Sequence, residues 1–161
     1  MEISWESEIS TLLTDLLAVQ DELLQMLNRK RVLLAEADTQ GLASIGQREE
    51  ELIVNLQQCL RRREELLSHA AQQGLPSSSI RALGRALPRA QRDRVQEQTH
   101  LAGSRARLLK HQSLTNWVLI QRTLIHLSQM LEIVATGGRL QPTYGEGEPA
   151  NVGGALVDRA G

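Results

Sequence analysis

The chain has 161 residues, an apolar fraction of 41%, an aromatic fraction of only 2% and no Phe. This length suits one domain, and the scarcity of aromatic residues argues against a sheet or sandwich core, which depends on β-branched and aromatic side chains. The formal net charge of −1 provides no overall attraction to nucleic acid or to an anionic membrane. Leucine must supply the core, as in helix bundles, so we predict an all-α protein.

The single cysteine, Cys59, cannot form an internal disulfide, which favours a reducing compartment. The N-terminal sequence is acidic and lacks the basic and apolar regions of a secretory signal. No apolar run approaches the roughly 20 residues that span a bilayer. These features predict a cytoplasmic protein.

The first predicted helix begins near Ser4 and runs to about Ala37, without Gly or Pro between Glu6 and Ala37. At about 1.5 Å per residue it is a rod of about 45 Å, a length typical of elongated coiled coils. Apolar residues recur along it in alternating steps of four and three residues, which places them on one helix face that must pack on another helix. These residues are Leu12, Leu16, Val19, Leu23 and Met26.

A short break at residues 38–41 separates this helix from a second one, which we expect Thr39 to cap and which runs to about Gln73. A short connection folds two helices back antiparallel, so we predict an elongated helical hairpin. The second helix repeats the apolar row with Leu42, Ile45, Leu52, Leu56, Cys59 and Leu66. Because Cys59 lies within this row, we predict a buried structural thiol and not a nucleophile.

The segment from Gly74 to Ser79 has the composition of a helix stop followed by a loop. A short helix is expected over about Ser78–Leu87, and a long third rod from Pro88 or Arg89 to Ala135. Gly103 and Ser104 are candidates for a kink in this last helix, and Gly137-Gly138 would end it.

Residues 139–161 are rich in Gly and Pro and have little apolar periodicity, so we expect them to be disordered in the free chain. The predicted organisation is therefore a helical domain over residues 1–138 and a flexible tail over residues 139–161.

A third apolar row, hereafter the apolar stripe, continues the same spacing near the end of the last helix. It consists of Trp117, Ile120, Leu124, Leu127, Leu131 and Val134. Val118, Ile125 and Ile133 lie on other faces, and a hairpin can cover only one face. Two interpretations remain open: the uncovered face packs within the bundle or a dimer, or it binds a helix of another protein.

The sequence gives no support for catalysis. None of the four histidines lies three or four residues from another His or from Cys59, so no helical metal pair exists. Residues 145–150 match a dinucleotide-binding fingerprint in letters only, because the fingerprint works between a strand and a helix and this segment contains Pro149. Acidic residues are scattered along helix surfaces. We predict no catalytic residue, no metal, no cofactor and no small-molecule ligand.

Residues 81–110 are basic, with eight Arg or Lys side chains against Asp93 and Glu97. Nucleic-acid binding usually combines such charge with stacking aromatics or a groove-fitting motif, and neither is present. We therefore expect a solvated face, or pairing with the acidic first helix, and keep nucleic-acid binding as the less favoured alternative.

Asn116-Trp117-Val118-Leu119-Ile120 and Thr123–Leu127 are followed by Gly137-Gly138 and by Pro142-Thr143-Tyr144-Gly145. This order resembles the C-terminal signature of the FlgN-type flagellar export chaperones, in which an Asn opens a Leu-rich amphipathic helix, a Gly ends it and a short tail carries Tyr-Gly. The Leu-rich first helix and the QREEELIVNLQQ segment fit as well, so the resemblance covers nearly all of residues 5–147.

The resemblance implies a non-enzymatic cytoplasmic chaperone of flagellar type III export. Such proteins bind the C-terminal helices of hook-associated (hook–filament junction) proteins, prevent their premature assembly and deliver them to the membrane export gate. By position, the apolar stripe would bind the client protein and Tyr144 would dock at the gate. A structural or regulatory coiled-coil adaptor is the alternative.

Overall fold

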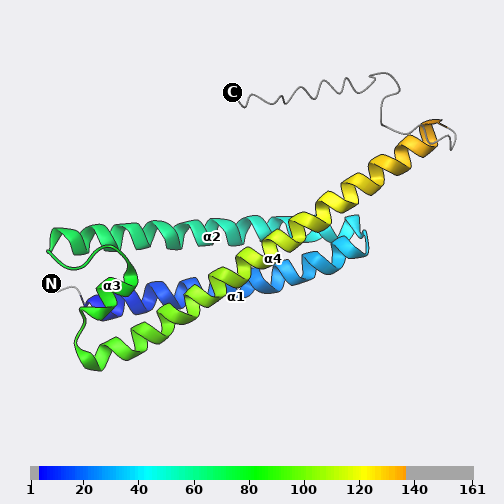
Figure 1. Cartoon of the computed structure of the whole chain (residues 1–161). Helices are drawn as coiled ribbons and strands as arrows, with labels where there is room; N and C mark the ends of the chain where they lie inside the picture. Colours follow the sequence, from blue (N-terminus) through cyan, green and yellow to red (C-terminus); the bar gives the residue numbers. More distant parts are fainter. Residues whose placement is uncertain (1–3, 137–161) are drawn as a thin grey trace, which may run out of the picture. The chain divides into compact units, whose positions relative to one another are not determined.

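The computed structural model describes residues 4–136, and all regular secondary structure in this part of the chain is helical, as predicted. It contains α1 (Trp5–Ala35), α2 (Thr39–Gln72), α3 (Ile80–Arg85) and α4 (Arg89–Thr136), shown in Figure 1. The chain divides into two units, residues 1–123 and 124–161. The first unit holds α1, α2, α3 and most of α4, and the second is described from Leu124 to Thr136.

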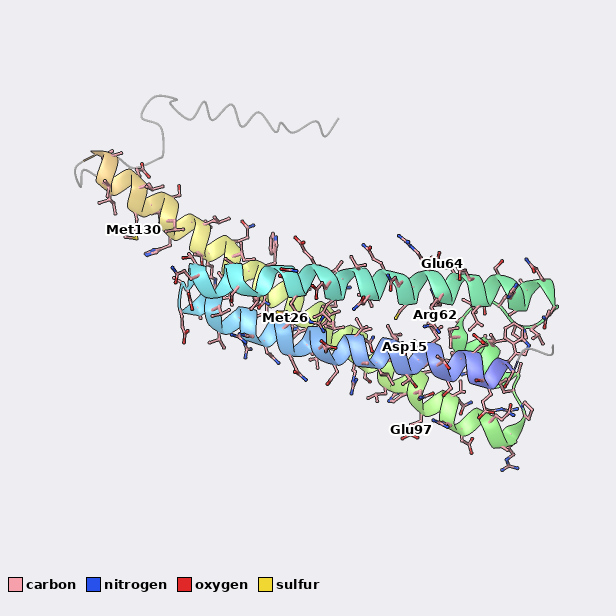
Figure 2. All side chains as sticks on the ribbon, turned by 180° about the vertical axis from the view of Figure 1, so that it is seen from behind. Asp15, Met26, Arg62, Glu64, Glu97 and Met130 are labelled. Carbon is pink, nitrogen blue, oxygen red and sulfur yellow. The ribbon has the colours of Figure 1, made fainter. Side chains whose placement is uncertain are left out.

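Helices α1 and α2 form the predicted antiparallel hairpin, and they lie side by side in Figure 1. Both apolar rows face the interior: Leu12, Leu23, Ile45, Leu52 and Cys59 are buried, and the other members are half-buried. Ion pairs join the two helices along the margins of this seam. Lys30 Nζ lies 2.8 Å from Glu49 Oε1. Arg62 Nη1 lies 2.6 Å from Asp15 Oδ2, and Figure 2 labels these two side chains.

The turn between α1 and α2 is capped by Asp38, not by Thr39 as predicted. The Asp38 carboxylate accepts a hydrogen bond of 2.9 Å from Gly41 N, and Thr39 is the first residue of α2. A side chain at Gly41 would displace the cap, because a Cβ there would lie 2.6 Å from both Asp38 Oδ2 and Leu33 Cδ2. The capping hydrogen bond of Asp38 therefore depends on glycine at position 41.

The other helix ends agree closely with the predictions. Ser4 caps α1 as expected, with its hydroxyl accepting from Ser7 N. Helix α3 is shorter than the expected Ser78–Leu87, because its cap is Ser79, whose hydroxyl accepts from Ala82 N at 3.1 Å. Helix α4 begins at Arg89 and remains helical through Gly103 and Ser104.

The core of the first unit lies where α3 and the start of α4 close one end of the hairpin. Ile9 of α1, Leu83 of α3 and Val95 of α4 are almost completely buried there. Side-chain hydrogen bonds join α4 to α1 in parallel order: Ser10 Oγ donates to Gln98 Oε1, and Asn116 Nδ2 donates to Leu27 O. In the first unit α4 therefore runs parallel to α1.

None of the helices between residues 4 and 136 is both long and apolar enough to cross a membrane. Gly137-Gly138, Tyr144 and the predicted flexible tail over 139–161 lie outside the described residues, so the division into residues 1–138 and 139–161 stays a prediction.

Candidate functional site

Helix α4 packs on the hairpin through a face that the sequence analysis missed. This face is spaced by seven residues and consists of Val95, Ala102, Leu109, Asn116 and Thr123. Val95, Ala102 and Asn116 are buried, and the other two are half-buried. The face contains mostly small or polar residues, so a search for apolar periodicity alone does not find it. The constant seven-residue spacing from Val95 to Thr123 is the feature of the sequence that could have revealed this face.

Buried amide side chains hold α4 against α1. Gln20 Nε2 donates to Ala102 O at 3.1 Å, and Asn116 Nδ2 donates to Leu27 O at 3.0 Å. The side-chain carbonyl oxygens of both amides are buried and have no partner among residues 4–136. Asn116 also differs from the family pattern in position, because it lies inside α4 and does not open the helix. The two hydrogen bonds therefore favour one register of α4 along α1. They leave two buried side-chain oxygens of the interface without a partner among residues 4–136.

Two members of the apolar stripe, Trp117 and Ile120, belong to the first unit. Trp117 is 58% exposed, whereas Ile120 is half-buried. Ile120 lies four residues after Asn116 and three before Thr123, so it borders the face of α4 that packs on the hairpin. The predicted stripe thus begins beside the packed face and not on it.

The other four members belong to the second unit, and all are exposed. Leu124 and Leu127 are 55% and 50% exposed, and Leu131 and Val134 are 70% and 79% exposed. Ile125, Met130 and Ile133 are exposed on the same helical segment. The described part of the second unit is this single helical segment, so no other described element of that unit covers these residues. An apolar segment of this kind marks a surface that lacks its partner.

Cys59 is buried in the hairpin seam, as predicted. Burial raises the pKa of its thiol, the negative charge of Asp15 raises it further, and Arg62 partly opposes the shift. A thiol that resists ionisation is a poor nucleophile. Residues 4–136 contain no cluster of three His, Cys, Asp or Glu side chains that could hold a metal ion.

The basic stretch is divided between two environments. Arg105 pairs with the acidic first helix, since its guanidinium donates to Leu17 O at 2.8 Å and lies 3.9 Å from Asp21. Arg92 donates to Leu87 O. Arg81 and Arg85, at the other end of the stretch, lie on α3, and among residues 4–136 neither side chain pairs with a carboxylate or donates to a backbone carbonyl.

Comparison with known proteins agrees with this architecture. The model of the FlgN protein family matches residues 1–148, which include every described helix. No curated protein and no solved structure matches the chain. The family comprises non-enzymatic flagellar export chaperones for hook-associated proteins. An all-helical chain that the family model matches over most of its length is a member: this chain belongs to the FlgN family.

Proposed function

We propose that this chain is a cytoplasmic export chaperone that binds a hook-associated protein through the apolar stripe of α4. The chaperone would cover the C-terminal helices of its client, prevent their premature assembly and bring the client to the export gate. Membership of the FlgN family supports the class of client. The exposure of Leu124, Leu127, Leu131 and Val134 is the observation that carries the assignment of the surface.

The spacing of these four residues suits a helical client. Leu124 and Leu131 are seven residues apart, as are Leu127 and Val134, which places them in a single seam on one side of α4. An amphipathic client helix would pack its own apolar residues along this seam, the mode in which one helix lies on another's apolar face. Complete burial of such a side chain contributes about 1.5–3 kcal/mol relative to exposure, so covering the four stripe residues would supply a large favourable term to client binding, which must exceed the entropy cost of association.

Trp117 and Ile120 extend the proposed client surface toward the hairpin. Trp117 offers the largest side chain of the stripe and is more than half exposed. Aromatic residues of this size dominate many protein interfaces. We assign Trp117 and Ile120 a supporting role, because Ile120 is already half-buried within the first unit and offers less free surface to a client.

Tyr144 is proposed to dock at the membrane export-gate component, on the basis of its place in the family signature. It lies outside the described residues and beyond α4, so client capture and gate docking would use different parts of the chain. Mutations should therefore separate the two activities.

Calorimetry with a purified hook-associated client tests the assignment. We expect Leu127→Asp/Leu131→Asp to abolish binding while the free energy of unfolding changes by less than about 0.5 kcal/mol, since both residues are exposed. The matched control is His126→Asp/Gln129→Asp, which adds charge to the same helical segment away from the seam and should retain binding. Unchanged affinity in the Leu127/Leu131 variant would refute the assignment.

A secretion assay tests the second role. Tyr144→Ala should preserve client affinity in solution and reduce only export of the client. Weakened client binding by Tyr144→Ala would mean that the tail belongs to the client surface.

A further inference from the structure

Helix α3 and the first turns of α4 line a basic hollow on the first unit. Arg81 and Arg85 reach it from α3, and Gln96, Thr99 and His100 reach it from α4. Asp93 and Glu97, the two acids of the basic stretch, do not line it. The hollow therefore combines two guanidinium groups and an imidazole without a carboxylate.

Close packing of α3 on α4 forms the floor of this hollow. A Cβ at Gly84 would lie 2.8 Å from Val95 Cγ1, so only glycine permits the observed approach of the two helices. Val95 is 1% exposed and belongs to the core of the unit. The floor of the hollow is thus part of the closely packed core, whereas Arg81, Arg85 and His100 around it are exposed.

The two arginines of the hollow are not engaged in ion pairs with the described residues. By contrast, Lys30 and Arg62 of the hairpin and Arg105 of α4 each lie within ion-pair distance of a carboxylate. Among residues 4–136, no carboxylate lies within that distance of Arg81 or Arg85. These two arginines are four residues apart on α3, so their side chains are neighbours on one helix face.

We propose that this basic hollow binds an acidic peptide segment of a protein partner. Each guanidinium group presents a planar set of donors that matches a carboxylate in a bidentate geometry. Two neighbouring arginines can thus take two carboxylates of one segment, while Gln96 and His100 offer further polar contacts at the rim.

The surroundings favour a peptide over an extended polyanion. No Phe, Tyr or Trp side chain lines the hollow, so nucleic-acid bases would lack the large aromatic platforms on which single strands usually stack. The chain as a whole carries a net charge of −1, which gives neither a DNA duplex nor an anionic membrane a long-range attraction. A short acidic segment needs only the local charge of the hollow.

This site is independent of the proposed client surface, because the hollow lies on α3 and the start of α4 whereas the client seam lies at Leu124–Val134. A chaperone with both surfaces could hold its client and contact a second, acidic protein at the same time.

Nuclear magnetic resonance of the isotope-labelled full chain tests the proposal, with a short oligo-glutamate peptide as the probe. We expect the peptide to shift the resonances of Arg81, Arg85, Thr99 and His100 and to leave those of the hairpin seam unchanged. This mapping uses the unmodified chain. Arg81→Glu/Arg85→Glu should then weaken binding at least about tenfold, because two charge-assisted contacts become repulsive.

The matched control is Arg61→Glu/Arg63→Glu, which makes the same change of net charge on α2 and should alter the affinity by less than about twofold. Equal losses in both variants would overturn the proposal, because they would show attraction by net charge alone. Shifts at the hollow caused by inorganic phosphate, duplex DNA or phosphatidylglycerol vesicles, but not by the peptide, would also overturn it.

Discussion

The hairpin seam and the end of α4 carry the same amino acids at the same spacing and differ in exposure. Leu52, in the α2 row, is 1% exposed, whereas Leu131, in the apolar stripe, is 70% exposed. Apolar periodicity shows that a helix face requires a partner, but it does not show whether the partner lies in the same chain. In the hairpin α1 and α2 cover each other. The described part of the second unit contains no other helix that could cover Leu124–Val134.

A second difference separates the α1–α2 interface from the α1–α4 interface. Its contact with α2 is a leucine seam bordered by ion pairs, whereas its contact with α4 relies on the buried amides Gln20 and Asn116. Apolar packing stabilises without selecting a register strongly, and a buried amide selects a register at some cost in stability. The four predictions below are ordered by their expected effect on stability.

The largest effect is expected from truncating the hairpin seam. Leu52→Ala should lower the free energy of unfolding by about 2–5 kcal/mol, because it leaves a cavity between α1 and α2. Leu131→Ala, the same substitution in the exposed stripe, should change it by less than about 0.5 kcal/mol. Urea unfolding followed by circular dichroism measures both. Equal losses would remove the distinction between the two apolar rows.

A smaller loss is expected at the α1–α4 interface. Asn116→Ala removes the hydrogen bond to Leu27 O and should cost about 1–2 kcal/mol. Asn28→Ala, on the exposed side of α1, is the control and should be close to neutral. If Asn116→Ala is neutral in the same urea experiment, the buried amide does not hold α4 on the hairpin.

The hairpin turn should respond to the loss of its cap. Asp38→Ala removes the acceptor for Gly41 N and should cost about 1 kcal/mol. Thr39→Ala should cost less, because Thr39 lies within the helix and accepts no capping bond. Thermal melts of the two variants decide between the residues, and a larger loss for Thr39→Ala would contradict the observed cap.

The smallest effect concerns the Cys59 thiol. Its pKa is raised in the folded chain, first by burial, so the unfolded chain loses this proton at lower pH. The contribution of the neutral thiol to stability is complete below the unfolded pKa of about 8.5. It declines as pH rises toward the folded-state pKa, by at most about 1.4 kcal/mol per pH unit. The urea midpoint should therefore fall with rising pH across this range, and it should fall less in Cys59→Ala than in the unmodified chain. The same pH dependence in both proteins would show that the thiol ionises equally in the folded and unfolded states.

The sequence was sufficient to predict the fold wherever apolar spacing and helix caps determined it. The rows of α1 and α2, the cap at Ser4 and the start of α4 were all predicted correctly. Asp38 was missed because Asp and Thr are both good caps and only the turn geometry distinguishes them. The α4 face that packs on α1 was missed because its Ala102, Asn116 and Thr123 carry little apolar surface.

The candidate surfaces were predictable to different degrees. The apolar stripe was visible as a row, but the partial burial of Ile120 depends on how α4 packs in the first unit. The basic stretch was visible as charge. Among residues 4–136 Arg105 is paired, whereas Arg81 and Arg85 are not. This division depends on how α4 packs on α1 and α3, which spacing along the chain does not reveal.

The central claim is that the hairpin seam holds the fold while the stripe at the end of α4 holds the client. Methyl resonance mapping on addition of a purified hook-associated client tests it most directly. We expect Leu124, Leu127, Leu131 and Val134 to shift and lose solvent contact, while Leu12 and Leu52 stay unchanged. A footprint on the hairpin seam, with the α4 residues unaffected, would contradict the claim.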